Sequence, residues 1–561
     1  MRSRRPDERV RPSPWPTPGS AVLALGVALA VSWLAAPPVA AAAAATPQPA
    51  PAARPAHDVG RLRDPAWLAQ VYLAADAGLV WFTDAGPRPA ATAVLQALRA
   101  AADRGLRPAD YDPASLERAI LGAAAPGADA DAIARADVAL TATFLHFLSD
   151  VRFGRVRPQD VEPHYRARSR DARFVAELRT AAASDGIEAL IDAAEPAFPV
   201  YARLKALLPR YRALAALPPI APPALDSPRA KVVAGDRYAG VAQLHDLLVR
   251  LGDLPADAAP PLDDRYTGAI AAGVARFQAR HGLAEDGVLG AQTIAALGVP
   301  LAARVTQIEL ALERMRWLPG FDGGRAIAIN VPSFQLWAFA DARDTGRATL
   351  SMPVIVGKAV QHETPIFIGE MRAVEFSPYW NVPRNILRHE TLPRLARDPG
   401  YLQREDMELV GTRGDGRVLT QVDAASLEAL RAGELRVRQR PGAKNALGGV
   451  KFVLPNTMEI YLHGTPAREL FERTRRDFSH GCIRVRDPAA LAAFVLQGKA
   501  EWSAEAIAAA MASGRNRTVP LDAPIPVVVF YTTAIVDAAG RALFLPDVYG
   551  HDRRLLEALR N

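Results

Sequence analysis

The chain has 561 residues, half of them hydrophobic and 23% charged, which excludes global disorder and allows two to four domains. The formal net charge is +7, but residues 1–42 contribute +3 of it, so the remainder carries only about +4. This small net positive charge argues against a nucleic-acid-binding protein, which would concentrate basic residues on one face. It is compatible with an anionic polymer as partner.

The first 42 residues are typical of an export signal rather than of a folded element. A stretch with five arginines, between Arg2 and Arg11, precedes an uncharged run of 16 residues at 21–36, and small residues follow at 39–45. A basic flank, a short apolar run and small residues describe a secretory signal, whereas a membrane span needs about 20 apolar residues. We expect residues 1–42 to be a signal peptide or an inner-membrane anchor, and the rest of the chain to lie in the periplasm.

Residues 43–57 are rich in Ala and Pro without periodicity, which indicates a linker. From 58 to 228, apolar residues recur at spacings of three and four, the pattern of amphipathic helices. The clearest expected helices are at 66–79, 90–105, 132–148 and 175–183. No motif in this region carries chemistry, so it is interpreted as a mostly helical scaffold.

A smaller helical module is expected over 229–299. Helices are predicted at 241–251 and 266–281, with Gly282 ending the second, and a turn at 286–290 leads to a third at 293–297. The run FQARHGLAEDGVLGAQTIAALG at 277–298 resembles the three-helix peptidoglycan-binding module of many wall enzymes. The alternative is a spacer that uses the same turn chemistry.

After an amphipathic helix at 306–318, the apolar period changes to two, which indicates a β-rich domain over 300–561. The expected strands are at 326–331, 335–339, 348–356, 366–376, 450–454 and 458–462. Between 384 and 445 the pattern becomes helical and charged again. We interpret this stretch as a helical insertion that can act as a lid over a site.

Cys482 is the only cysteine of the chain, so no internal disulfide can form. It lies 19 residues after His463, in the run Ser479-His480-Gly481-Cys482. A thiol is mostly protonated at neutral pH, and a nearby imidazole can take its proton and hold the charge as an ion pair. A buried, inert cysteine is the alternative, but two histidines around a lone thiol favour nucleophilic catalysis.

The residues around the thiol suit an active-site turn. Gly481 allows a tight turn and close approach of a substrate, and the amides of His480, Gly481 and Cys482 can form an oxyanion hole. Asp487-Pro488 then begins a helix, with Asp as the cap. A zinc site would need a fourth ligand, and there is no second cysteine; we therefore expect neither a metal nor an organic cofactor.

The run His463-Gly464-Thr465, followed by SHGCIRV at 479–485, resembles the signature of the L,D-transpeptidase catalytic domain. Other short runs also resemble this family: VGK at 356–358 with TP at 364–365, SPYWNVP at 377–383, RQ at 438–439, PG at 441–442 and NALG at 445–448. The domain order resembles the large periplasmic L,D-transpeptidases over essentially everything after the linker. The expected fold class is therefore α+β and multidomain, with a mostly α scaffold, a three-helix module and a β-rich catalytic domain.

The resemblance also implies residue roles. Cys482 would be the nucleophile and His463 the general base and acid, with Gly464 orienting the imidazole through its carbonyl. The implied supporting residues are Ser479, His480 and Gly481 in the turn, Arg484 holding the turn or meeting a substrate carboxylate, and Tyr461 and Trp380 lining the cleft.

The reaction that the resemblance implies is a ping-pong acyl transfer between peptidoglycan stem peptides. Cys482 attacks a tetrapeptide donor at the L-centre of meso-diaminopimelate, D-Ala leaves, and a second stem's amine resolves the thioester as a 3→3 cross-link. Acylation by carbapenems is implied as well. Two alternatives stay open: a cell-wall cysteine peptidase that uses water as acceptor, and a non-catalytic peptidoglycan-binding scaffold, against which the intact Cys and His argue.

Overall fold

The computed structural model describes residues 64–560, apart from 74–77, 167–171, 222–223, 226, 228–229, 322, 413, 415 and 538. The expected signal at 1–42 and linker at 43–57 lie outside the described residues. Among those described, no single helix has the length and apolar character to cross a membrane; the bent pair α11 (Ala291–Leu297) and α12 (Leu301–Met315) meets that test by length and composition only.

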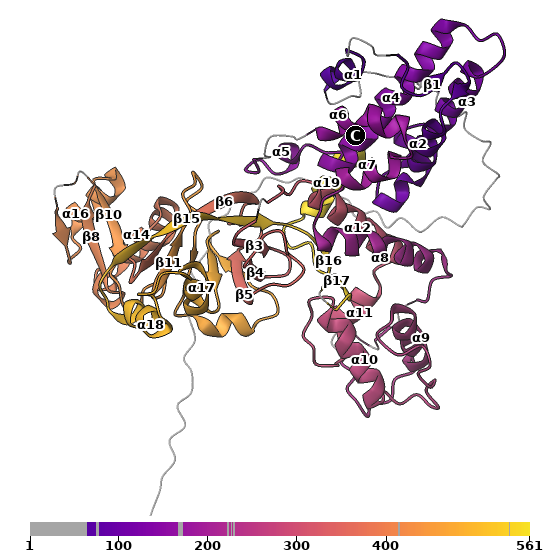
Figure 1. Ribbon diagram of the computed structural model, residues 1–561. Coiled ribbons are helices and arrows are strands. Elements are labelled where there is room, and N and C mark those ends of the chain that lie inside the picture. The colour runs from indigo at the N-terminus through magenta and orange to yellow at the C-terminus, as the bar shows by residue number, and fades with distance from the viewer. Residues whose placement is uncertain are drawn as a thin grey trace, which may run out of the picture. The chain divides into compact units, whose positions relative to one another are not determined.

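The scaffold region is helical, as predicted (Figure 1). Its longest helix, α4 (Ala130–Phe153), packs against α1, α2, α3 and α7 and buries Leu140, Phe144 and Leu148. Asp137 of α4 is also buried, and its carboxylate accepts hydrogen bonds from the amides of Val80 and Trp81 at 3.1 and 2.7 Å. The other helices are α1 (Pro65–Tyr72), α2 (Pro89–Arg99), α3 (Pro113–Ala123), α5 (Pro158–Val161), α6 (Arg173–Ala183), α7 (Ile187–Ala194) and α8 (Pro199–Ala216), and a short hairpin pairs β1 (Phe82–Thr83) with β2 (Gly86–Pro87).

Two scaffold helices end earlier than their apolar periodicity suggested. The helix predicted at 66–79 is α1, which ends at Tyr72. The helix predicted at 90–105 divides into α2 and a 3-10 turn at Ala100–Arg104. Gly105 ends this turn with φ of 70°, a left-handed conformation that glycine adopts without strain.

The three predicted helices of the small module are present as α9 (Val241–Leu251), α10 (Gly268–Ala279) and α11. Their shared core includes Leu244, Leu248 and Val274. Gly282 follows the second helix with φ of 67°, as its expected role in ending that helix requires.

The C-terminal domain is built on a sheet of nine strands in the order β13-β5-β14-β12-β11-β6-β15-β3-β4. Strand β4 also pairs with β5, so eight of these strands close on themselves around one core. The strands are β3 (Ala326–Asn330), β4 (Gln335–Phe339), β5 (Leu350–Gly357), β6 (Phe367–Phe376), β11 (Val450–Val453), β12 (Leu462–His463), β13 (Asp477–Ser479), β14 (Ile483–Val485) and β15 (Arg517–Phe530). The remaining elements are α17 (Pro488–Val495), α18 (Ala504–Ala512), α19 (His551–Arg560) and the hairpin of β16 (Ala534–Val536) and β17 (Ala542–Phe544).

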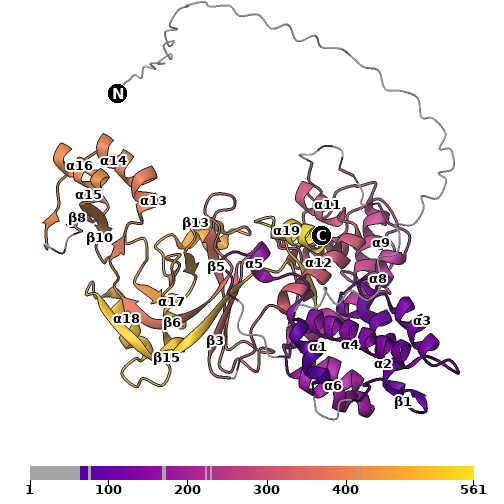
Figure 2. The same cartoon turned by 90° about the horizontal axis from the view of Figure 1, so that it is seen from above.

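The insertion is not purely helical, which corrects the prediction for 384–445. Four strands, β7 (Trp380–Asn381), β10 (Leu435–Gln439), β8 (Met407–Gly411) and β9 (Val418–Leu419), form a separate antiparallel sheet in that order. Around it lie α13 (Arg384–Ile386), a π-helical turn (Leu387–Thr391), α14 (Leu392–Arg397), α15 (Tyr401–Arg404) and α16 (Ala424–Ala432), gathered together in Figure 2. These elements bury a core of their own, including Leu395, Leu409 and Val437.

The strand predicted at 458–462 is also wrong for most of its length. Residues 456–461 form a turn in which the Asn456 side chain takes the place of a neighbouring strand. Its oxygen accepts from the amides of Met458 and Ile460 at 3.0 and 3.1 Å, and its nitrogen donates to the carbonyls of Leu454 and Ile460. The strand β12 that follows therefore contains His463 itself instead of ending before it.

Candidate active site

The register of two short parallel strands brings the candidate residues together. Strand β12 pairs with β14, with Leu462 opposite Ile483 and His463 opposite Arg484. Leu462 and Ile483 point into the core, where both are buried. Because side chains alternate along a strand, His463 and Arg484 lie on the other face. Cys482 directly precedes β14, and Tyr461 links it to His463: the Tyr461 hydroxyl interacts with Cys482, and the Tyr461 ring centre lies 5.6 Å from that of His463.

The His463 imidazole is held in one tautomer. Its Nδ1 lies 2.5 Å from the carbonyl oxygen of Gly464, which can only accept, so Nδ1 carries the proton and Nε2 is left with a free lone pair. Burial, with the nearby cations of Arg484 and Lys451, lowers the pKa of His463 to about 3. The imidazole is therefore neutral at physiological pH and presents Nε2 as a base.

The Cys482 thiol is also favoured in its neutral form. Burial raises the pKa of Cys482 above its ordinary value, and the backbone and hydroxyl of Tyr461 and the cation of Lys451 oppose that rise. The Sγ–H donates to the carbonyl of Glu459, with 3.5 Å between Sγ and oxygen. The resting pair is thus a thiol and a neutral imidazole rather than the ion pair expected from the sequence.

The turn before Cys482 is fixed by hydrogen bonds that the Ser479 hydroxyl makes on both sides. The Ser479 hydroxyl donates to the Cys482 carbonyl at 2.5 Å and accepts from the Gly481 amide at 3.2 Å. Gly481 has φ of 112°, a conformation that residues with a side chain rarely adopt. Since the Gly481 amide is engaged by Ser479, the Cys482 amide, which has no acceptor among the described residues, is the better oxyanion donor.

Residues without a predicted role support this turn from the opposite side. The Thr364 hydroxyl donates to the Gly481 carbonyl at 2.7 Å and accepts from the Gly357 amide at 2.8 Å. The Tyr549 hydroxyl in turn donates to the Gly357 carbonyl at 2.5 Å. Thr364 belongs to the TP run noted above, whereas nothing in the sequence pattern singled out Tyr549.

The insertion reaches the same turn through a hydrogen bond between two side chains. Glu390, in the π-helical turn of the insertion, lies 2.6 Å from Nε2 of His480, with both side chains partly exposed. The His480 ring also lies 4.7 Å from that of His362. Burial and the neighbouring His480 lower the pKa of His362. His480, two positions before Cys482, therefore contacts the insertion, and the sequence did not predict this contact.

Aromatic and basic side chains surround the thiol. Tyr461 interacts through its hydroxyl with both Cys482 and Trp380, and burial is the main reason why its pKa is raised. Lys451 lies 4.6 Å from the centre of the Tyr461 ring. Burial lowers the pKa of Arg484, and its Nε has no hydrogen-bond partner among the described residues. The site thus offers cations and aromatic walls around one sulfur.

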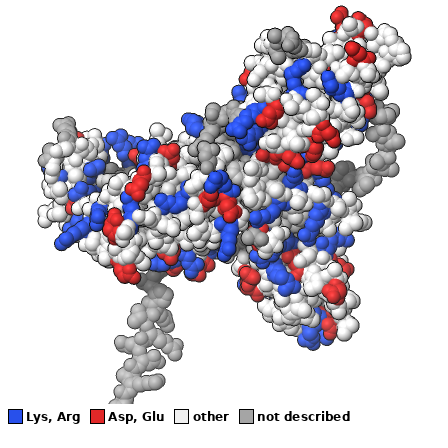
Figure 3. All heavy atoms as spheres, in the orientation of Figure 1, with Lys and Arg blue, Asp and Glu red and all other residues white. Residues whose placement is uncertain are grey.

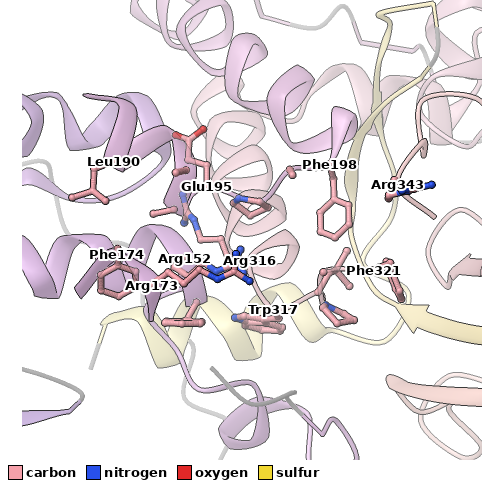
Figure 4. Close-up of a pocket in the computed structure, with 18 of the residues that line it drawn as sticks. Arg152, Arg173, Phe174, Leu190, Glu195, Phe198, Arg316, Trp317, Phe321 and Arg343 are labelled. Atoms are coloured by element: carbon pink, nitrogen blue, oxygen red, sulfur yellow. The ribbon is translucent and has the colours of Figure 1, made fainter. Parts of the chain in front are cut away.

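Other features of the described chain bear on alternative functions. No group of three or more His, Cys, Asp or Glu side chains is arranged to hold a metal ion in the part of the chain that the structure describes. Lys and Arg are interspersed with Asp and Glu over the face in Figure 3. A cavity of about 610 Å³ lies away from Cys482, between the scaffold and the segment after α12 (Figure 4). Its Arg316, Glu195 and Arg343 are already paired with opposite charges.

Comparison with known families agrees with this geometry. Residues 324–519 match the model described as "L,D-transpeptidase catalytic domain", residues 237–297 match "Putative peptidoglycan binding domain", and residues 66–208 match "Scaffold domain". Residues 324–519 are therefore similar to the L,D-transpeptidase catalytic domain.

A curated relative carries the same type of name. A protein of Haemophilus influenzae named "Putative L,D-transpeptidase" is 32% identical over 278 residues, which is 49% of this chain and 54% of that protein. The match thus spans about half the length of the relative.

Proposed function

We propose that this chain is a peptidoglycan L,D-transpeptidase that forms 3→3 cross-links through a thioester on Cys482 and releases D-Ala. The observation that carries the proposal is the pairing of β12 with β14, which brings a neutral His463 near the start of the strand that follows Cys482, with Tyr461 in contact with both residues. A neutral imidazole with a free Nε2 can act as the base that this chemistry requires.

In the proposed first half-reaction, the Cys482 proton passes to Nε2 of His463 as Sγ attacks the carbonyl carbon of the donor tetrapeptide. The oxyanion that forms is stabilised by the amide of Cys482. The carbon–nitrogen bond to D-Ala then breaks, and the imidazolium of His463 gives its proton to the leaving amine. A thioester on Cys482 remains, and His463 is neutral again.

In the second half-reaction, the side-chain amine of diaminopimelate from another stem attacks the thioester. His463 takes a proton from this amine, and the sulfur leaves and recovers a proton, which restores the resting pair. Two contacts of the insertion support transfer to an amine over hydrolysis: Glu390 with His480, and Trp380 with Tyr461. They place the insertion beside the thiol, where it can limit the access of water.

The cations around the thiol support an anionic stem peptide as substrate. Arg484 and Lys451 both act on the electrostatics of the Cys482 and His463 pair. Guanidinium and ammonium groups are suited to hold the free carboxylates of a stem peptide. We further propose that residues 1–42 direct export to the periplasm, as a cleaved signal or as an anchor.

The decisive experiment incubates the purified protein with disaccharide–tetrapeptide and separates the products by mass. Release of D-Ala with 3→3 dimers supports the proposal, whereas shortened monomers alone would assign the chain to the hydrolases. If neither product forms and a carbapenem adds no mass, the chain is a binding scaffold. Cys482→Ala is the inactive control, and persistence of dimers in that variant would exclude Cys482 as the nucleophile.

A further inference from the structure

A second cavity, of about 330 Å³, lies outside the catalytic site, where the small helical module meets α8, α12 and β17. Its lining combines aromatic rings and guanidinium groups, among them Tyr211, Arg250, Phe277, Arg280, Arg304 and Phe544. No acidic side chain of the described residues lines it. Three arginines therefore face one small cavity that offers them no carboxylate.

Only one of the three arginines has its charge balanced. Arg280 makes a bidentate ion pair with Asp253, at 2.6 and 2.5 Å. Arg304 donates to the side-chain oxygen of Gln307 at 2.7 Å and to the Ala296 carbonyl at 3.2 Å. Arg250 donates to the Pro218 carbonyl at 2.5 Å. Neither Arg304 nor Arg250 has a carboxylate within ion-pair distance in the part of the chain that is described.

The unbalanced charge of Arg304 is costly where it lies. The residue is only 8% exposed, and a buried cation without an opposite charge loses hydration that neutral acceptors replace in part. Burial and the neighbouring Arg280 lower the pKa of Arg304 to about 10. Burial, together with Arg280 and Arg304, lowers the pKa of His281 well below its ordinary value, so His281 adds no charge. An anion in the cavity would offset this repulsion.

The walls set the size and chemistry of what can enter. His281 stacks on Phe277 at 3.8 Å between ring centres, and Tyr211 meets Phe544 edge-on at 4.9 Å. Ligand cavities are commonly about 300–1,000 Å³, so this one is small, and it suits a chain end rather than a polymer segment. Its occupant should combine a carboxylate with a short apolar group.

We infer that this cavity is a second binding site, which takes the carboxylate-bearing end of a peptide with small apolar side chains. The choice of a peptidoglycan stem as that peptide rests on the proposed function. The anion site itself does not, since none of its residues belongs to the catalytic turn. Occupation would hold the wall polymer at the module while a different stem reacts at Cys482.

The test titrates disaccharide–tetrapeptide into the full chain carrying Cys482→Ala, followed by isothermal calorimetry. We expect two sites, one of which is lost or weakened at least tenfold by Arg304→Gln and by Arg250→Gln. The same probe with every carboxylate amidated should bind the cavity at least tenfold more weakly. Arg237→Gln, an exposed arginine of the same module that pairs with Asp264, is the matched control and should change neither site.

The competing role for Arg304 is structural, in which it simply braces the end of α11 against Phe544. In that case Arg304→Gln would lower the melting temperature while both sites keep their affinity, and Arg250→Gln would be silent; this result overturns the inference. Equal binding of the amidated probe also overturns it. If the proposed function were wrong, purified protein would form no 3→3 dimers, or dimers would persist in Cys482→Ala, while this titration would still show its second site. The two proposals therefore fail separately.

Discussion

The low pKa of His463 makes a quantitative prediction about the pH dependence of acylation. A histidine with its ordinary pKa of about 6.5 is about 3% neutral at pH 5, so a base of that kind loses activity about 30-fold between pH 7.5 and 5. His463, with a pKa of about 3, stays neutral throughout this range. Because the pKa of Cys482 is raised, the thiol also keeps its proton. The reactive pair therefore has constant composition, and the acylation rate should change less than about twofold.

The assay is the second-order rate of acylation by a carbapenem whose own charge is constant from pH 5 to 7.5, followed by stopped-flow absorbance. Lys451→Met removes one of the cations that depress the pKa of His463, so its acid limb should move upward. Lys499→Met, at a lysine paired with Asp522, is the control. A tenfold loss per pH unit would mean that a small thiolate population reacts instead, and a loss of about 30-fold would mean that burial does not hold His463 neutral; either result refutes the reasoning.

The contacts of the turn and the buried imidazole make three more predictions. Glu390→Gln should lower kcat/KM for stem peptides severalfold. It should cost less than about 1 kcal/mol of stability, because the pair with His480 is partly exposed. The control Glu428→Gln, in an exposed pair of the same insertion, should change neither kcat/KM nor stability. Gly481 has φ of 112°, so Gly481→Ala should cost about 1–3 kcal/mol of stability and most of the activity. Gly514→Ala, at φ of 65° in open space, should keep activity. Equal activities of the two variants would contradict the strain argument. The pKa of His463 is lower in the folded state than in the unfolded state, so its contribution to stability is complete above the unfolded pKa and is lost as pH falls toward 3. Between pH 7.5 and 5 this loss amounts to about 2 kcal/mol. In urea unfolding, His463→Gln should therefore lose less free energy of unfolding between these two pH values than the unchanged protein.

Much of the architecture could be predicted because its patterns are local. The helices of the small module follow from apolar spacing and from Gly282, and the long strands of the C-terminal sheet follow from alternation over five or more residues. Strand β10 shows why the insertion was different. Its sequence, LRVRQ, alternates as well, but it is flanked by charged helical segments, so period alone could not separate it from a helix.

The candidate pair of Cys482 and His463 stood out in the sequence for a different reason, since two histidines shortly before a lone thiol form a residue set that suits nucleophilic catalysis. The environment of the pair was not predictable. The contact of Glu390 with His480 joins residues 90 positions apart, and the Asn456 turn depends on one side chain satisfying several backbone groups. The protonation states follow from burial and from Arg484 and Lys451, which only the folded chain brings to His463.

The most direct test of the central claim is the intact mass of the protein after brief incubation with a tetrapeptide donor and acid quench, followed by peptide mapping. We predict an added mass equal to the donor less one alanine, located on the peptide that contains Cys482 and absent from Cys482→Ala. An adduct on any other residue, or D-Ala release without an adduct in a protein that turns over, would contradict the assignment of Cys482 as the nucleophile.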